Sequence, residues 1–233
     1  MKIKTLLPSL LVAGTLMFTA CNKEAMTTMS DDDISESMSN DFSESSGGTS
    51  TDISASARTA AVLNSSVFCG LTGDSTFVYV GTGGRYNLTT TWTWVVTCTS
   101  GTPTSIDFTN TGNAAFNGTA LSFTNTFVGD ASITDLSNAT EFTAAGTSVR
   151  TGTGSFEGKR RTKDFTYVTT FTYTDVKIKR SDYTISSGTG TAHCVGAVVD
   201  GEAFDRTATI SFQGDGTYIV TLDNGNVYTF NLK

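Results

Sequence analysis

The sequence has little of several residue types, and each shortage excludes a class of protein. Among its 233 residues are one histidine, two prolines and four cysteines. Two prolines exclude collagen-like and proline-rich chains, and four cysteines are too few for a disulfide-stapled scaffold. Basic residues are outnumbered 15 to 22 by acidic ones, for a formal net charge of −7. This balance argues against a nucleic-acid binder, because such proteins need a basic surface.

The first twenty residues are organised like a secretory signal peptide. Two lysines precede an apolar run from Leu6 to Phe18, and this run is shorter than the ~20 residues of a membrane-spanning helix. Thr19, Ala20 and Cys21 follow. They resemble the lipobox of bacterial lipoproteins, with Phe18 in place of the usual leucine, as tolerated in lipoproteins of the Bacteroidota type. The resemblance implies a signal peptide over 1–20 and lipidation of Cys21; an ordinary secretory signal is the alternative.

Residues 22–58 are acidic and poor in apolar side chains. Because such a composition cannot offset the entropy lost on ordering, we predict a disordered, lipidated tether over 21–58. Within it, the segment Ser30-Asp31-Asp32-Asp33 resembles the acidic surface-export signal of Bacteroidota lipoproteins. That resemblance implies a folded part that faces the cell exterior from the outer membrane. A merely solvating acidic linker is the alternative.

From residue 59 onward the sequence alternates between large apolar residues and small or β-branched ones. The stretch from Phe165 to Tyr173 is typical of a half-buried strand. Glycine-containing turns separate several such stretches. We therefore predict an antiparallel all-β domain over 59–233, a meander that forms a sandwich or an open barrel-like sheet with little or no helix.

The first hairpin offers a register that can be tested. A two-residue turn at 83–84 would pair Tyr79 with Leu88 and Cys69 with Cys98. The two cysteines would occupy a non-hydrogen-bonded pair, where side chains approach most closely. We predict a disulfide between Cys69 and Cys98, which an oxidising cell envelope permits.

The C-terminal segment offers a second register. Three-residue loops at 214–216 and 224–226 would place Phe212 opposite Tyr218 and Leu222 opposite Tyr228. One apolar face would then run across three strands. This segment resembles the C-terminal β-segments of many Bacteroidota lipoproteins, a resemblance that implies no activity.

Trp92 and Trp94 are the first candidate binding residues. They share one face of a predicted strand, about 6.5–7 Å apart. If exposed, they would form an aromatic platform for a glycan. The predicted register places them beside Leu88 and Val96, which favours the alternative that they belong to the core.

A basic run between two predicted strands is the second candidate. Lys159, Arg160, Arg161 and Lys163 could bind an anionic polymer such as a phosphorylated lipopolysaccharide or an acidic glycan. A solvated turn is the alternative.

No pattern indicates catalysis or metal binding. His193 is the one histidine, and Cys194 beside it is expected to be a small buried residue. Glycoside hydrolysis needs two converging carboxyl groups, but the candidate acids stand mostly near predicted turns, where Asp is common for local reasons. These acids are Asp130, Asp135, Glu141, Glu157, Asp200, Glu202 and Asp205.

The sequence thus predicts a non-catalytic, lipid-anchored cell-envelope protein that binds a glycan or protein ligand, without cofactor, metal or nucleic acid. Two alternatives stay open: a periplasm-facing carrier or assembly factor that holds an apolar ligand in a half-open sheet, and a hydrolase.

Overall fold

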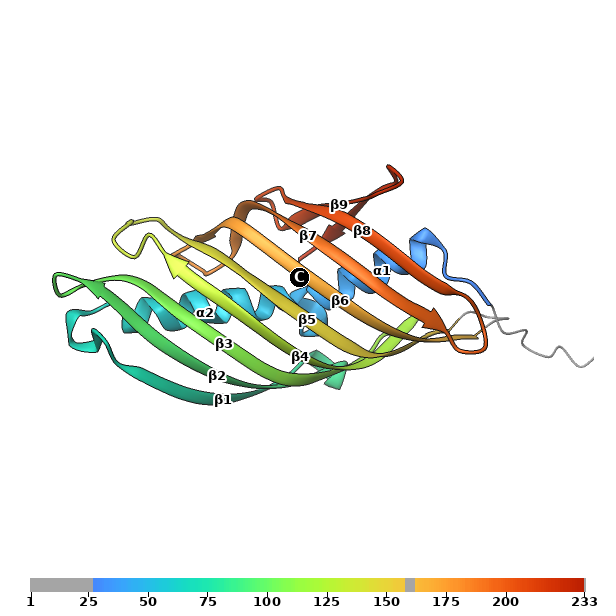
Figure 1. Cartoon of the computed structure of the whole chain (residues 1–233), viewed down its shortest axis with the longest axis horizontal. Helices are drawn as coiled ribbons and strands as arrows, with labels where there is room; N and C mark the ends of the chain where they lie inside the picture. Colours follow the sequence, from blue (N-terminus) through green and yellow to red (C-terminus); the bar gives the residue numbers. More distant parts are fainter. Residues whose placement is uncertain (1–26, 158–161, 233) are drawn as a thin grey trace, which may run out of the picture.

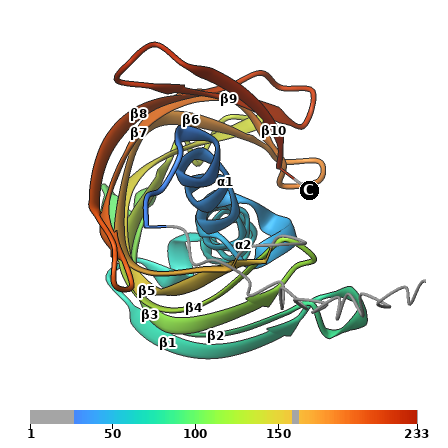
Figure 2. The ribbon, with the colours of Figure 1, turned by 90° about the vertical axis from the view of Figure 1, so that its right-hand side faces the viewer.

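The computed structural model describes residues 27–157 and 162–232. The predicted signal peptide and Cys21 lie outside these residues. Ten strands form one antiparallel sheet in which every strand pairs with its neighbours in sequence. The sheet is long and strongly curled (Figure 1), and it wraps around two helices that lie on its concave side (Figure 2).

The elements follow one another in a simple order. The helices come first, followed by the strands: α1 (Asp31–Phe42), α2 (Thr49–Leu63), β1 (Thr72–Val80), β2 (Tyr86–Thr99), β3 (Thr102–Asn117), β4 (Leu121–Thr134), β5 (Glu141–Glu157), β6 (Thr162–Lys179), β7 (Ile185–Val198), β8 (Ala203–Phe212), β9 (Thr217–Leu222) and β10 (Val227–Asn231).

Alternation of side chains produces the two faces of the sheet. In β6, Phe165, Tyr167 and Phe171 are buried on the concave face, while Thr166 and Thr172 are exposed on the convex face. This arrangement follows from the period of two along a strand. The prediction of an antiparallel all-β meander is confirmed, and its strands form a single curled, open barrel-like sheet.

The predicted register of the first hairpin is confirmed. Tyr79 pairs with Leu88, and Cys69 and Cys98 form a disulfide with their Cα atoms 5.5 Å apart. The loop is longer than predicted, because the Gly81 N–H donates to the Tyr86 carbonyl at 2.8 Å. The loop therefore spans residues 82–85, centred where the two-residue turn was predicted.

The C-terminal register is confirmed in one hairpin and wrong in the other. Phe212 pairs with Tyr218 as predicted, but Tyr218 then pairs with Phe230, and the β9–β10 pairing is displaced by two residues. The cause is the loop, which closes at a hydrogen bond from Leu222 N–H to the Asn226 carbonyl. A displacement of two preserves the face of every side chain, so the continuous apolar face survives.

The disordered tether predicted over 21–58 is wrong for most of the part that the structure describes. Residues 31–42 and 49–63 form α1 and α2. Ser30 caps α1 in a reciprocal capping box with Asp33, an arrangement that satisfies backbone donors at a helix start. The predicted domain boundary at residue 59 falls inside α2, so the folded body includes both helices.

Packing explains why the helices form. Ile34, Met38 and Phe42 recur every four residues and are buried, which gives α1 one apolar stripe. The Phe42 ring lies 5.5 Å from the Phe171 ring and 5.3 Å from the Phe212 ring, centroid to centroid. The concave face of the sheet and the apolar faces of the helices thus form one core. Within the described residues, no helix has the length and apolar character needed to cross a bilayer.

Candidate functional site

A charged side chain lies at the centre of the fold. Arg150 on β5 is 0% exposed, because it falls on an inward position of the strand. Its Nη2 lies 3.4 Å from the Asp52 carboxylate, and its Nε donates to Thr49 Oγ1 at 3.3 Å. The guanidinium also stacks over the Phe127 ring, 4.7 Å from the ring centroid. Arg150 therefore joins the sheet to the start of α2.

A second buried acid lies in the same centre. Asp41 near the end of α1 accepts hydrogen bonds from Asn125 Nδ2 and from the Tyr167 hydroxyl, each at 3.0 Å. Burial raises the pKa of Asp41 to about 6, although the charge of Arg150 opposes the shift. Burial raises the pKa of Asp52 to about 6 as well, again against the charge of Arg150.

The hydrogen bonding of this centre is incomplete. Asp41 Oδ2, Asp52 Oδ1 and Arg150 Nη1 are buried and make no hydrogen bond within the described residues. A cavity of about 10 Å³ adjoins Asp52 and Ser148, which is room for about one water molecule and for no larger ligand. The contacts of Arg150 with Asp52 and Thr49 hold α2 against the sheet, and the cavity beside Asp52 is too small for a substrate.

Sequence reasoning missed Arg150, Asp41 and Asp52. One signal was available: Arg150 interrupts the inward-facing positions of a strand whose other inward residues are small or apolar. A buried arginine requires acidic partners. The identity of those partners could not be read locally, because Asp52 lies 98 residues away in the sequence.

The acidic run before the first helix is also engaged. Asp31 Oδ1 accepts from Arg206 Nε at 3.0 Å, and Asp31 Oδ2 accepts from Asn226 at 2.9 Å. Asp32 accepts from the Tyr228 hydroxyl at 2.8 Å. Acidic residues in the first turn of a helix are also favoured by its dipole.

Asp33, the third acidic residue of the run, bears on the predicted anion-binding role of Lys163. It forms an ion pair with Lys163, whose side chain is buried. Partial burial alone would raise the pKa of Asp33, but hydrogen bonds from Lys163 and Ser30 hold that pKa below its ordinary value. The basic run predicted that Lys163 could bind an anionic polymer. This prediction is wrong, because Lys163 is buried and paired with Asp33. Lys159, Arg160 and Arg161 lie outside the described residues.

The predicted tryptophan platform is not on the surface. Trp92 is 2% exposed and packs between the rings of Phe77 and Phe108, at centroid distances of 5.0 and 6.0 Å. Trp94 is partly buried, and its ring lies directly against Gly73 of the neighbouring strand. The favoured expectation that Trp92 belongs to the core is confirmed, and the glycan platform, which required exposed rings, is excluded for Trp92.

Two of the remaining candidates, His193 and Asp205, form one contact on the convex face. His193 is exposed on the convex face, 2.8 Å from Asp205. Cys194 is buried and accepts a hydrogen bond from Thr169, and burial raises its thiol pKa to about 12. Among the residues described, no three His, Cys, Asp or Glu side chains are grouped as a metal site would need.

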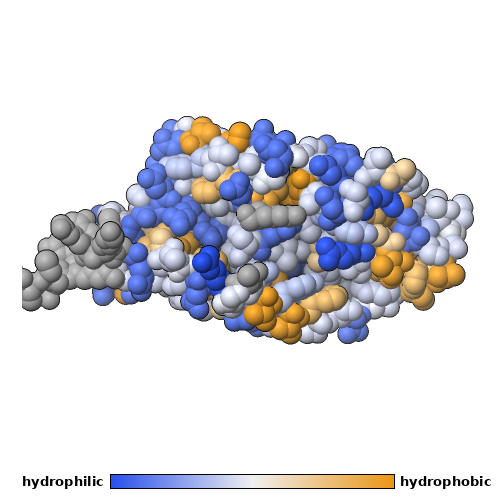
Figure 3. Space-filling view, turned by 180° about the vertical axis from the view of Figure 1, so that it is seen from behind, coloured by the Kyte–Doolittle hydropathy of each residue, from blue (hydrophilic) through white to orange (hydrophobic). Residues whose placement is uncertain are grey.

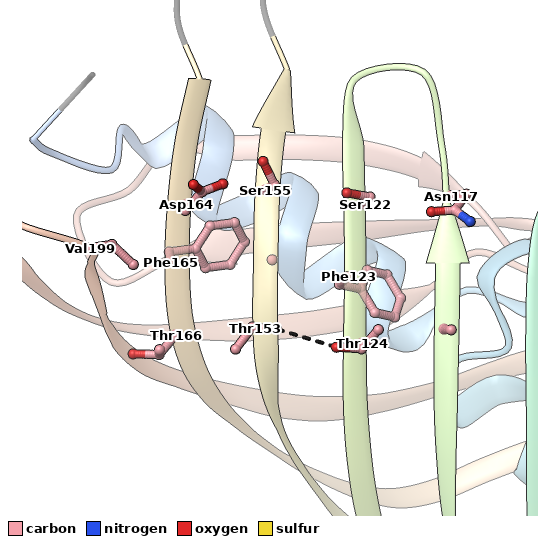
Figure 4. A pocket seen from close by; sticks show the side chains of 12 residues that line it. Asn117, Ser122, Phe123, Thr124, Thr153, Ser155, Asp164, Phe165, Thr166 and Val199 are labelled. Carbon is pink, nitrogen blue, oxygen red and sulfur yellow. Dashed lines mark hydrogen bonds between the residues drawn. The ribbon is translucent and has the colours of Figure 1, made fainter. Parts of the chain in front are cut away.

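A hollow on the convex face is the best candidate for ligand contact. It has a volume of about 440 Å³, and its lining includes side chains from β3, β4, β5 and β6 (Figure 4). Within its lining, Thr124 on β4 and Thr153 on the paired strand β5 have their hydroxyls 3.2 Å apart. Its polar lining residues are Asn117, Ser122, Thr124, Thr153, Ser155, Asp164 and Thr166.

A second surface hollow, of about 660 Å³, is lined by Glu44, Val80, Arg85 and Tyr86 among others. It lies at the β1–β2 loop and beside the connection between the helices, whereas the first is built on paired strands. Side chains on strands hold a fixed geometry better than side chains on loops. The hollow over β3, β4, β5 and β6, which we call the hydroxyl-lined hollow, is therefore the stronger candidate.

No family model, no curated protein and no solved structure matches this chain. The functional assignment therefore depends on the residues and geometry described above.

Proposed function

We propose that this chain is a lipid-anchored, non-catalytic binding protein of a bacterial cell envelope. In this proposal Cys21 carries the lipid, and the folded body faces the exterior of the outer membrane. The signal-like residues 1–20, the lipobox-like segment ending at Cys21 and the acidic run at 31–33 support the anchor and the location.

One observation carries the binding role: α1 and α2 fill the concave face of the sheet. A carrier of apolar ligands would need that face open, and here Phe42 and the apolar stripe of α1 occupy it. Ligand contact is therefore assigned to the convex face. The hydroxyl-lined hollow is the place where polar side chains from four strands converge on it.

The polar side chains of the hollow, which lie among apolar ones that include Phe123, Phe165 and Val199, favour a glycan. Hydroxyl and amide groups donate as well as accept hydrogen bonds, and a carboxylate accepts. Together they match sugar hydroxyls, which do both. A hollow of about 440 Å³ lies within the size range of small-molecule sites in proteins.

A pair of matched variants tests this assignment. Thr153→Trp places a large ring in the hollow, whereas Thr109→Trp places the same ring elsewhere on the convex face. The two positions are matched, because the Thr109 hydroxyl contacts that of Thr93 as the Thr153 hydroxyl contacts that of Thr124. On a glycan array we expect at least a tenfold loss of binding for Thr153→Trp and little change for Thr109→Trp. Absence of any glycan binding by the native protein, or equal losses in both variants, would contradict the assignment.

Anchoring and location have their own measurements. Mass spectrometry of the mature N-terminal peptide should show acylated Cys21, and Cys21→Ser should release the protein from the membrane fraction. Protease added to intact cells should degrade the native protein. Firm membrane association of Cys21→Ser would refute the anchor, and full protection from protease would refute the outward orientation.

A further inference from the structure

The first described residues are fixed at one end of the sheet. The Thr27 carbonyl accepts a hydrogen bond from the Glu202 N–H at 2.7 Å, and Gly201 lies directly against Thr27. Glu202 belongs to the β7–β8 turn, which lies at the same end as the β3–β4 turn (Figure 1). We call this end the N-terminal rim and define it by Thr27 and residues 118–120 and 199–202.

The acidic run fastens α1 to the same part of the fold. Asp31 pairs with Arg206 near the start of β8, and Asp33 pairs with Lys163 near the start of β6. Lys163 is buried, and removing one partner from a buried ion pair is strongly unfavourable. The chain is therefore attached to the N-terminal rim from Thr27 onward, and the long tether expected from composition does not exist in this part.

The remaining reach of the chain is short. Six residue steps separate Cys21 from Thr27, and a fully extended chain spans at most about 3.6 Å per residue, or about 22 Å here. The 14 residues of β4 span roughly 46 Å at about 3.3 Å each. A lipid on Cys21 can therefore lie near the N-terminal rim but not near the opposite end of the sheet.

We infer that the N-terminal rim faces the lipid bilayer and that the opposite end of the sheet, with the β2–β3 and β4–β5 turns, points away from it. This inference rests on the proposed lipid anchor at Cys21. The partner is the headgroup layer of the membrane that holds the anchor, within about 22 Å of Thr27.

The surface offers one competing orientation. Val62 and Val67, at and just beyond the C-terminal end of α2, are 70% and 73% exposed, and α2 ends far from the point where α1 begins (Figure 1). From behind, the surface is mostly hydrophilic, and hydrophobic residues gather at the end opposite the N-terminal rim as well as in smaller patches elsewhere (Figure 3). Contact of these apolar side chains with lipid would place the opposite end of the sheet at the bilayer.

Two labelling positions at the two ends of β4 distinguish the orientations. Thr119 in the β3–β4 turn and Ser137 in the β4–β5 turn are both exposed, so Thr119→Cys and Ser137→Cys form a matched pair. A thiol-reactive fluorophore would label the new cysteine selectively, because the Cys21 thiol carries the lipid in the lipidated protein, Cys69 and Cys98 are joined and Cys194 is buried. The lipidated full-length protein is then bound to phosphatidylcholine vesicles that contain nitroxide-headgroup lipid.

We expect the nitroxide to quench the label at position 119 at least three times more strongly than the label at position 137. Insertion of 20 Gly/Ser residues after Ala25 should remove most of this difference, since such a linker adds about 25 Å of average reach. Equal quenching, stronger quenching at position 137, or no quenching at either position of a vesicle-bound protein would overturn the orientation. An unacylated N-terminal peptide, measured separately, would refute the anchor itself and the orientation with it.

Discussion

Replacement of Arg150 by methionine tests whether the buried charged centre holds the helices in place. In Arg150→Met, Asp41 and Asp52 lose the positive charge that opposes the effect of their burial. Breaking a buried ion pair by removing one partner costs about 3–5 kcal/mol, a large part of the 5–15 kcal/mol that typically stabilises a domain. Urea unfolding at pH 7.5, followed by the fluorescence of buried Trp92, measures this loss.

Arg206→Met is the matched control. Arg206 also pairs with an aspartate, Asp31, at 3.0 Å, but its side chain is 37% exposed. Exposed pairs contribute about 0–1 kcal/mol, so the control should unfold close to the native midpoint. The reasoning is refuted if Arg150→Met loses less than about 1 kcal/mol, or no more than Arg206→Met loses.

A triple variant separates loss of the charge pair from loss of packing. Arg150→Met combined with Asp41→Asn and Asp52→Asn leaves no charge in the centre. The cost of removing one partner of a buried ion pair comes mainly from the charge left without compensation. Because the triple variant leaves no such charge, most of the lost stability should return. If the triple variant is no more stable than Arg150→Met alone, the loss came from the side-chain volume and its contact with Phe127.

Two further predictions follow from the same core. Asp41 and Asp52 have folded-state pKa values raised to about 6 from 3.8, so between pH 4 and 6 the folded state keeps protons that the unfolded state has released. The contribution of the two carboxyl groups to stability is therefore greatest below pH 4 and is lost as the pH rises to 6. The urea concentration at the unfolding midpoint should fall between pH 4 and 6 in the native protein. It should fall less in the Asp41→Asn, Asp52→Asn double variant. A chain reduced to residues 59–233 lacks α1 and most of α2, which exposes the rings that pack against Phe42 on the concave face. This fragment should aggregate or bind a hydrophobic dye, whereas residues 27–233 should fold. A soluble 59–233 fragment that unfolds cooperatively would contradict the integral role of the helices.

The strands could be predicted because their information is local. From Phe165 to Tyr173 the alternation alone identifies the buried face, and the burial of Phe165, Tyr167 and Phe171 follows it. The β1–β2 register was predictable because the cysteines and the glycine turn agree on it. The β9–β10 register was not, because Asp223, Asn224 and Gly225 form the loop and any of several three-residue choices fits the same pattern.

The helices were missed because composition concealed a periodic signal. Ile34, Met38 and Phe42 stand four residues apart, as do Ile53 and Ala57, which is the spacing of a helical stripe. Between these apolar positions the chain is rich in serine and acidic residues, whose composition indicated a solvent-exposed, disordered segment. Many of them are buried instead and find hydrogen-bond partners in the fold, as Ser39 does with Tyr218 at 2.7 Å.

The acidic run shows why no count of residue types could have placed residues 27–58 correctly. Asp33 contributes to the negative charge that suggested disorder, yet its charge is met by Lys163, 130 residues later in the sequence. Asp52 likewise forms an ion pair with Arg150, and the charge of Arg150 also lowers the pKa of Asp41; Arg150 lies on a strand far from both helices in sequence. Composition indicates whether a segment can bury enough apolar surface by itself to become ordered. Here the segment becomes ordered by packing against the inner face of the sheet, which composition does not describe. Order in residues 27–58 is therefore a joint property of the helices and the sheet, and a truncation at residue 59 removes one of the two partners.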